Sequence, residues 1–428
     1  MSNLPNPTES PSRRRRRTGW RKRKATLAIG VAVALLIVGY TFDIFDAQGR
    51  DLLRKYAGII INMGTQPPDW QEGVIGEKGH IPPPPTGQEP SATPANPATP
   101  IYQIYFTDPT CPPEEERHGG LDETIAADLL TAAAQVDVAA FDLDAEPIVQ
   151  ALIDLAGNGR TVRVVTDTDN ADLSSIRRLR RNGISVVEDK RNGLMHNKFI
   201  VIDQKILWMG SLNYTSSGVY CNNNNLVRFA SPELAANYVA EMDEMYIERS
   251  FGPSSPINTP HEKLVVQGIE IENYFAPERE LELVNVIART VVRAEEEILF
   301  MAFSFTNEEI GEAMLGRADA GVPLRGIFES TGADSESSYY PIMAAAGLPN
   351  VAVLRDANPY IMHHKVIIVD RQTVVLGSFN FSASANRSND ENIAVVHAAA
   401  FAAPFVAEFE RLRAAEEHEG RQRQLTTC

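Results

Sequence analysis

The chain has 428 residues, of which 43% are hydrophobic and 22% are charged. This length exceeds one small domain, and this composition excludes a collagen-like, wholly disordered or multi-span membrane chain. Three cysteines are too few for a disulfide scaffold, and no CxxC pair or His/Cys cluster predicts a zinc framework. The net charge is -16, but residues 1–24 sum to +8, which leaves -24 on the remainder. Such an acidic body is poorly suited to nonspecific nucleic-acid binding.

An apolar segment directly follows the basic residues 1–24. Residues 25–42 carry no charge over 18 positions. A helix of that length would span about 27 Å at ~1.5 Å per residue, close to the ~30 Å hydrocarbon core of a bilayer. We therefore expect one uncleaved transmembrane anchor, with residues 1–24 in the cytoplasm and everything after Asp43 on the other side. A cleaved signal peptide and a buried helix are the alternatives.

Residues 43–100 are predicted to form a linker. Between residues 64 and 100 the chain is rich in Pro, Gly, Ser and Thr, and it includes four consecutive prolines at 82–85. Such a composition buries little apolar surface and favours extended polyproline II. We interpret it as a spacer that holds the rest of the chain away from the membrane.

Residues 101–428 contain one pattern twice. Residues 136–167 match residues 298–329 at a constant offset of 162. Each copy has the pattern of a buried strand, a helix that ends near a glycine, and a second strand. This βαβ unit predicts a parallel or mixed sheet in each of two domains, which we place at residues 101–262 and 263–428.

A second stretch is also duplicated, from 194–226 to 361–393, at an offset of 167. Eleven of the 31 positions from 195 to 225 are identical to their partners, without a gap. In the first copy these are Met195, His196, Lys198, Ile200, Asp203, Gly210, Ser211, Asn213, Ser217, Asn222 and Asn225. A purely structural duplication would preserve mainly apolar residues and glycines. Most of these identities are polar, which indicates shared chemistry.

Each copy places a His-x-Lys pair on a predicted strand and a Gly-Ser-x-Asn sequence shortly afterwards. Because side chains alternate along a strand, His196 and Lys198 share one face and Asp203 lies on the other. An imidazole, a cation, a hydroxyl and an amide are what attack on a phosphodiester needs. Asp203 and Asp370 are interpreted as structural pairing or capping residues, since alternation points them away.

The paired HxKxxxxD and GSxN motifs resemble the phospholipase D superfamily over about residues 101–400. The resemblance implies two tandem α/β sandwich domains related by a pseudo-twofold axis, here preceded by one transmembrane helix. It also implies chemistry through a phosphohistidine intermediate without metal or other cofactor. Its implied catalytic pair is His196 and His363. By position, the implied phosphate-binding residues are Lys198, Lys365, Asn213 and Asn380, with Ser211 and Ser378 in support.

One position differs between the copies. Glu391 stands in the second copy where Asn224 stands in the first. A carboxylate beside an imidazole favours imidazolium, whereas an amide orients the ring without that bias. We expect Glu391 to keep His363 protonated as the general acid, and His196 to attack phosphorus. In the alternative, the carboxylate stabilises the phosphohistidine cation.

Other residues receive structural interpretations. Noncatalytic roles are expected for His80, His118, His261, His364 and His397. Core positions are expected for Phe106, Tyr214, Phe275 and Phe381. Residues 405–419 predict a docked amphipathic helix. Cys111 and Cys221 would be able to pair outside the cytoplasm, but the sequence does not show their separation.

Three functions are compatible with these motifs. The favoured one is a membrane-anchored phospholipase D-type hydrolase of phospholipid headgroup esters, whose substrate is the membrane. The alternative is a metal-independent endonuclease that cleaves single-stranded DNA or RNA. A binding scaffold with a relic site is disfavoured because both copies retain His and Lys. No protein partner follows from the sequence.

Overall fold

A computed structural model of the chain describes residues 101–278 and 282–426, with side chains up to residue 416. These residues belong to one compact unit, Pro94–Cys428. The predicted basic segment, anchor and linker, residues 1–100, lie outside the described residues. Of the helices that are described, none is long and apolar enough to cross a bilayer.

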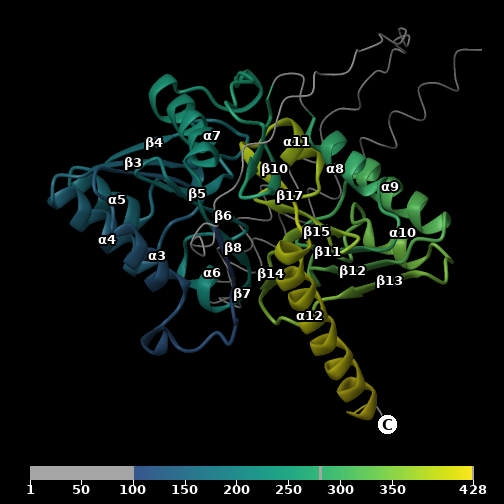
Figure 1. Cartoon of the computed structure of the whole chain (residues 1–428). Helices are drawn as coiled ribbons and strands as arrows, with labels where there is room; N and C mark the ends of the chain where they lie inside the picture. The colour runs from purple at the N-terminus through teal and green to yellow at the C-terminus, as the bar shows by residue number, and fades with distance from the viewer. Residues whose placement is uncertain (1–100, 279–281, 427–428) are drawn as a thin grey trace, which may run out of the picture. The chain divides into compact units, whose positions relative to one another are not determined.

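The first half of the described chain builds a seven-stranded mixed sheet (Figure 1). In spatial order its strands are β1 (Tyr102–Phe106), β8 (Asn225–Ala230), β6 (Ile206–Gly210), β5 (Lys198–Ile202), β2 (Gln135–Ala140), β3 (Thr161–Thr166) and β4 (Ser185–Glu188). Its helices are α3 (Leu121–Leu129), α4 (Glu146–Gly157), α5 (Ser174–Arg181), α6 (Ser216–Tyr220) and α7 (Pro232–Asp243). Strands β2, β3 and β4 are parallel and the other pairs are antiparallel.

The second half builds an eight-stranded mixed sheet. Its order is β13 (Val351–Arg355), β12 (Leu324–Phe328), β11 (Ile298–Ala302), β15 (Lys365–Val369), β16 (Thr373–Gly377), β17 (Glu391–His397), β10 (Ile269–Ala276) and β9 (Lys263–Val266). Its helices are α8 (Leu283–Val291), α9 (Glu308–Asp319), α10 (Tyr340–Ala344), α11 (Ala383–Arg387) and α12 (Ala399–Thr426). Shorter turns of 3₁₀ type cover Glu114–Glu116, Thr168–Asn170 and Gly252–Ser254, and a π-helical turn covers Glu244–Glu248.

Both predicted βαβ units are confirmed. Strands β2 and β3 are parallel around α4, and β11 and β12 are parallel around α9. Each helix ends before a glycine in the left-handed region, Gly159 at φ 78° and Gly321 at φ 99°. A side chain is strained at such φ values, so glycine ends the helix where the chain must turn back to the sheet.

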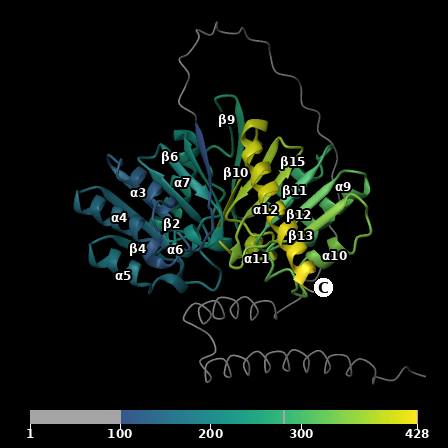
Figure 2. The same cartoon turned by 90° about the horizontal axis from the view of Figure 1, so that it is seen from below.

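Three apolar clusters hold the layers together. One packs α3, α4 and α5 on the first sheet, and a second packs α8 and α9 on the other sheet. The third contains buried residues of both sheets together with α7 and α12. Phe401 of α12 contacts Tyr102 and Phe229 of the first half, and Tyr238 of α7 contacts Phe275 of the second half. Figure 2 shows α7 and α12 beside the two sheets. The third cluster therefore joins the halves through apolar burial.

Sequence-based expectations for the core are largely confirmed. Tyr214, Phe275 and Phe381 are buried, and Phe106 is partly buried against the third cluster, which joins the halves. The predicted docked helix is part of α12, which begins earlier than expected, at Ala399, and buries Phe401, Phe405, Phe409 and Leu412.

The structural interpretation of Asp203 and Asp370 is also confirmed. Asp203 accepts hydrogen bonds from the backbone N–H groups of residues 133–135, at 2.7 to 2.9 Å. Asp370 accepts them from residues 295–297, at 2.7 to 3.1 Å. Each carboxylate thus fixes the loop that leads into β2 or β11. In both copies the last residue of the HxKxxxxD pattern therefore holds a loop in place, as the structural interpretation predicts.

We predict that Asp203→Asn lowers the free energy of unfolding at pH 7 by about 1 kcal/mol, measured by urea denaturation, since water screens these exposed contacts. Burial alone would raise the pKa of Asp203, but the three backbone hydrogen bonds lower it below its usual value. A lowered pKa stabilises the fold above the unfolded-state pKa of ~4, and this contribution is lost as the pH falls. The deficit should therefore shrink below about pH 4. Glu312→Gln, at an exposed position of α9, is the control, and equal losses in both variants would contradict the prediction.

Candidate active site

The two motifs meet across the boundary between the halves. The backbone N–H of His196 donates to the carbonyl of Asp390 at 2.9 Å, and that of His363 donates to the carbonyl of Asn223 at 2.8 Å. Strands β7 (Asn222–Asn223) and β14 (Ile361–Met362) extend this contact as a two-stranded parallel sheet. Both imidazoles are buried, and His196 is close enough to contribute to the lowered pKa of His363. One site therefore contains both histidines.

Each imidazole is held by a side chain from the opposite half. The Nδ1 atom of His196 lies 2.8 Å from both carboxylate oxygens of Glu391. The Nδ1 atom of His363 lies 3.0 Å from Oδ1 of Asn224. Ser378 and Ser211 in turn donate to these partners, at 2.6 Å to Glu391 and 2.9 Å to Asn224. In both histidines the side chain of the opposite half engages Nδ1, so attack on a substrate or proton transfer to it would use Nε2.

The expectation that Glu391 supports His363 is therefore wrong. Glu391 is the first residue of β17, directly after Asp390, whose carbonyl binds the backbone of His196. This backbone contact places the Glu391 carboxylate beside His196, the histidine of the other half. An alignment of the two copies shows that positions 224 and 391 are equivalent, but it cannot show which histidine each one faces.

Burial dominates the electrostatics of this site. It lowers the pKa of His363 well below the usual value, and Lys365 and Lys198 lower it further. Burial raises the pKa of Glu391. The charge of Lys198 and the hydrogen bond from Ser378 act in the opposite direction and lower this pKa. Because the donor groups of Ser378 and Asn389 are also directed at Glu391, we assign its oxygens as acceptors of the His196 Nδ1 proton.

Two buried lysines flank the imidazoles. Nζ of Lys198 donates to the carbonyl of His196, and Nζ of Lys365 donates to the carbonyl of His363, each at 2.7 Å. Burial lowers the pKa of Lys365 well below its usual value, and the charge of Lys198 lowers it further. Two ammonium groups that repel each other in a buried site favour the binding of an anion.

Two phenylalanines that the sequence interpretation treated only as strand residues also belong to the site. The Phe141 ring lies 5.0 Å from the His196 ring and 5.0 Å from Nζ of Lys198. Phe303 does the same in the second half, at 4.8 Å from His363 and 4.5 Å from Nζ of Lys365. Each ring orients one imidazole and favours one cation over its face. Phe141 and Phe303 are 162 residues apart, which is the offset of the first duplicated stretch, and this match was the available signal.

Asn213 and Asn380 follow strands β6 and β16. In both, the side-chain Oδ1 atom is buried and has no hydrogen-bond partner among the residues that the structure describes. A buried polar atom without a partner costs ~1–3 kcal/mol, so two of them at equivalent positions indicate a place for a ligand. A flip of either amide would direct its N–H donors to the same place.

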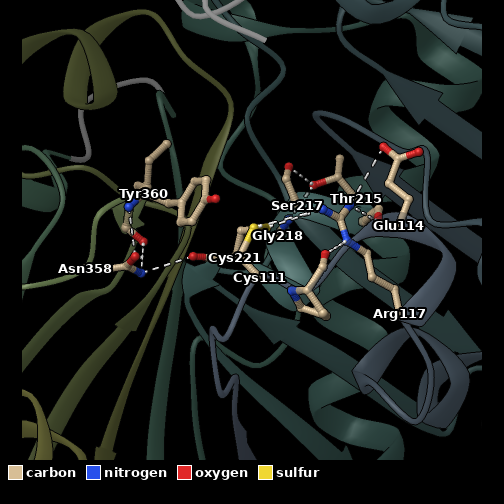
Figure 3. Close-up of a disulfide and its surroundings, with 12 residues drawn as sticks. Cys111, Glu114, Arg117, Thr215, Ser217, Gly218, Cys221, Asn358 and Tyr360 are labelled. Atoms are coloured by element: carbon tan, nitrogen blue, oxygen red, sulfur yellow. Dashed lines mark hydrogen bonds and ion pairs between the residues drawn. A yellow bond between two sulfur atoms is a disulfide. The ribbon is translucent and has the colours of Figure 1, made fainter.

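The structure answers the question left open for the cysteines. Cys111 and Cys221 form a disulfide with a Cα–Cα distance of 4.3 Å (Figure 3). It ties the loop after β1 to the segment that carries Asn224, the partner of His363. From the second half, Asn358 donates to the carbonyl of Cys221 at 3.1 Å. The disulfide therefore supports one histidine but has no counterpart at Ser388, the position equivalent to Cys221.

Of the histidines that were expected to be noncatalytic, those that the structure describes do not share this site with His196 and His363. His364 is buried on the opposite face from His363, His118 is exposed, and His397 contacts Glu272. His261 lies in the connection before β9, and His80 falls outside the described residues. Within residues 101–278 and 282–426, no group of three or more His, Cys, Asp or Glu side chains is placed to hold a metal ion.

These motifs and their geometry agree with a comparison against protein families. The family described as cardiolipin synthase, PLD-like domain, matches residues 125–246 and 287–413, which is more than half of the chain. The chain belongs to the phospholipase D superfamily. The two matched stretches correspond to the two mixed sheets, which are tandem phospholipase D-like domains.

Individual relatives match shorter stretches. A mitochondrial cardiolipin hydrolase of Chlamydomonas reinhardtii is 32% identical over 118 residues, covering 27% of this chain and 53% of that protein. A phospholipase D of Rickettsia prowazekii is 27% identical over 206 residues, covering 47% of this chain and 86% of that protein. The solved phosphatidylserine synthase of Haemophilus influenzae has a TM-score of 0.53 at 12% identity, covering 73% of this chain and 86% of that chain, and it supports the fold alone. The match thus spans only about half the length of the algal relative.

We predict that thiol titration of the denatured protein without reductant will find one free thiol, that of Cys428, and three after reduction. The disulfide closes a loop with a sequence separation of 110, so its loss should cost about 5 kcal/mol of unfolding free energy in the chain-entropy description. Urea denaturation with and without dithiothreitol measures this cost. The double variant Cys111→Ser/Cys221→Ser should match the reduced protein. Three free thiols before reduction would contradict the assignment.

Proposed function

We propose that this protein is a phosphodiesterase that hydrolyses phospholipid headgroup esters through a phosphohistidine intermediate. The observation that carries the proposal is the pair of imidazoles, one from each half, in a buried site with two lysines. Relatives named phospholipase D and cardiolipin hydrolase support the same class of chemistry.

The lysines and asparagines would bind the phosphate group. A phosphodiester anion between Lys198 and Lys365 relieves the repulsion that lowers the pKa of Lys365. The amides of Asn213 and Asn380 would donate to its non-bridging oxygens. As negative charge builds on these oxygens during attack, the same donors bind the transition state more tightly than the ground state.

We assign His196 as the nucleophile. Its Nδ1–H donates to Glu391, so Nε2 carries the lone pair that attacks phosphorus. Formation of the N–P bond puts a positive charge on the imidazole, and the Glu391 carboxylate stabilises that charge. Asn224 offers His363 no such charge. The assignment agrees with the sequence-based expectation, but its physical reason is the alternative one, stabilisation of the phosphohistidine cation.

His363 would act as the general acid. Its protonated Nε2 donates to the leaving alkoxide as the P–O bond breaks, and the headgroup alcohol departs. Its lowered pKa makes the imidazolium a strong proton donor, and the bound phosphate anion favours the protonated form that the free site disfavours. In the second step neutral His363 takes a proton from water, the oxygen attacks phosphorus, and the N–P bond to His196 breaks to release phosphatidate.

We further propose that residues 25–42 anchor the protein and that the catalytic halves lie outside the cytoplasm. The charge asymmetry around the apolar segment supports this orientation. The disulfide also supports it, because disulfides persist mainly in oxidising compartments. The acidic body favours a lipid over a polyanionic nucleic acid, and the spacer would let the site reach a headgroup.

We predict that the full chain releases headgroup from phospholipid vesicles in the presence of EDTA. Single-stranded DNA and RNA are the comparison substrates under the same conditions. His196→Ala and His363→Ala should each lower headgroup release by at least about 10³-fold, because either change removes a participant in both steps. Cleavage of nucleic acid without lipid turnover would replace the proposed substrate, and turnover that both variants retain would contradict the site.

Leaving-group dependence tests the two histidine roles. A diester with a p-nitrophenolate leaving group needs little protonation, so His363→Ala should retain most of the first-step burst on that substrate and accumulate phosphoenzyme. His196→Ala should show no burst, because the nucleophile is missing. Rapid quench followed by peptide mapping locates the phosphate. A phosphate found on His363 in the wild-type protein would reverse the assignment.

A further inference from the structure

The residue after each motif histidine makes the same kind of contacts in both halves. Asn197 donates from Nδ2 to Glu241 of α7 at 2.9 Å and accepts from Asn392 at 2.7 Å. His364, its equivalent, contacts Glu408 of α12 at 3.2 Å through Nε2 and Asn225 at 3.0 Å through Nδ1. Each residue therefore links a helix of its own half to an asparagine of the opposite half.

Those asparagines connect to the groups that hold the catalytic imidazoles. The backbone N–H of Asn225 donates to Oγ of Ser211 at 3.1 Å, and Ser211 donates to Asn224, the partner of His363. A second hydrogen-bonded path makes the equivalent contacts, starting from the helix of the first half. It runs through Glu241, Asn197, Asn392, Ser378, Glu391 and His196.

The two helix carboxylates also match in the sequence. Glu241 and Glu408 are 167 residues apart, the same offset that relates the catalytic histidines. Over Pro232–Asp243, Glu241 is the one polar residue that the equivalent stretch of α12 repeats. Both side chains are buried, at 5% and 4% exposure. Burial of a carboxyl group is costly unless it is hydrogen-bonded, so retention of both favours a shared role.

We propose that Glu241 and Glu408 are positioning residues for the two catalytic histidines, acting through Asn197 and His364. Each carboxyl group holds the residue after a histidine, which fixes an asparagine of the other half and through it the partner of a catalytic imidazole. The inference concerns turnover at the site described above and rests on the proposed function.

The chemistry of His364 is determined by its two partners. The NH₂ group of Asn225 is oriented toward Oγ of Ser211 as well as toward Nδ1 of His364. In this orientation it can only donate, so it requires an unprotonated Nδ1, and the proton on Nε2 then goes to the carboxylate of Glu408. Burial lowers the pKa of His364, which agrees with this neutral form. Asn197 offers the same pair of groups, a donor to the helix carboxyl and an acceptor to the asparagine. An asparagine at position 364 should therefore preserve the function of His364, whereas an apolar side chain of similar size should not.

Four variants of the full chain test the proposal, with a chromogenic phosphodiester as the common substrate. His364→Asn and Glu408→Gln keep the required donor or acceptor and should retain kcat within about threefold. His364→Leu and Glu408→Leu should lower kcat about 10- to 100-fold with KM unchanged, because the imidazoles lose alignment and the phosphate contacts remain. Glu410→Gln is the matched control on α12, since Glu410 pairs with Arg325 and Arg413 outside the path, and it should keep wild-type kcat.

Folding and function are separated by further measurements. If the leucine variants unfold, Glu408→Asp keeps the charge near Arg411 but withdraws it from His364, and it should still lower kcat about tenfold. A proton NMR signal for the Nδ1–H of His363 should shift in the leucine variants and stay in place in the Asn and Gln variants, whether or not the substrate turns over. Equal kcat values in all variants, or an unchanged His363 signal, would overturn the positioning role. An inactive wild-type protein with the expected NMR shifts would overturn the proposed function alone.

Discussion

The burial of two imidazoles and two ammonium groups in one place is the constraint on which the rest of this structure depends. Taking such groups out of water is unfavourable unless each has a partner of fixed geometry. Each half supplies the partner for the imidazole of the other half, which meets this requirement. Neither half contains a complete site. The apolar cluster shared by α7, α12 and both sheets is therefore a condition for catalysis as well as for stability.

This exchange also explains which polar residues the two copies retain. Ser211 and Ser378 follow β6 and β16 and orient the partners of the histidines. Asn225 is the first residue of β8 and Asn392 is the second residue of β17. Each contacts a residue of the opposite half, His364 and Asn197 respectively. By contrast Asp203 and Asp370 hold the loops before β2 and β11, far along the strand from the imidazoles. One repeated pattern thus combines two physical tasks, and strand alternation separates them.

Much of this arrangement was predictable from the sequence. The repeat offsets predicted the two βαβ units, and period-two alternation predicted that His196 and Lys198 share a face while Asp203 does not. The partner of each histidine was not predictable in this way, because an internal alignment compares equivalent positions and carries no information about contacts between copies. Phe141 and Phe303 were missed for a different reason. An apolar residue at the end of a buried strand looks like core, and only the geometry shows the ring beside an imidazole and a lysine.

Placement of both halves in one chain permits differences that a symmetric dimer cannot have. In a dimer of identical subunits, one substitution changes both copies of a site at once. Here Glu391 holds one histidine and Asn224 the other, so the two imidazoles differ in charge environment within one site. The residues after them differ too, as Asn197 and His364, although both present a donor and an acceptor in the same directions. Only the first half has the disulfide, beside the segment that holds His363. The proposed two-step reaction would need a nucleophile and an acid with different proton affinities, and the sequence differences between the two halves supply different partners for the two imidazoles within a shared geometry.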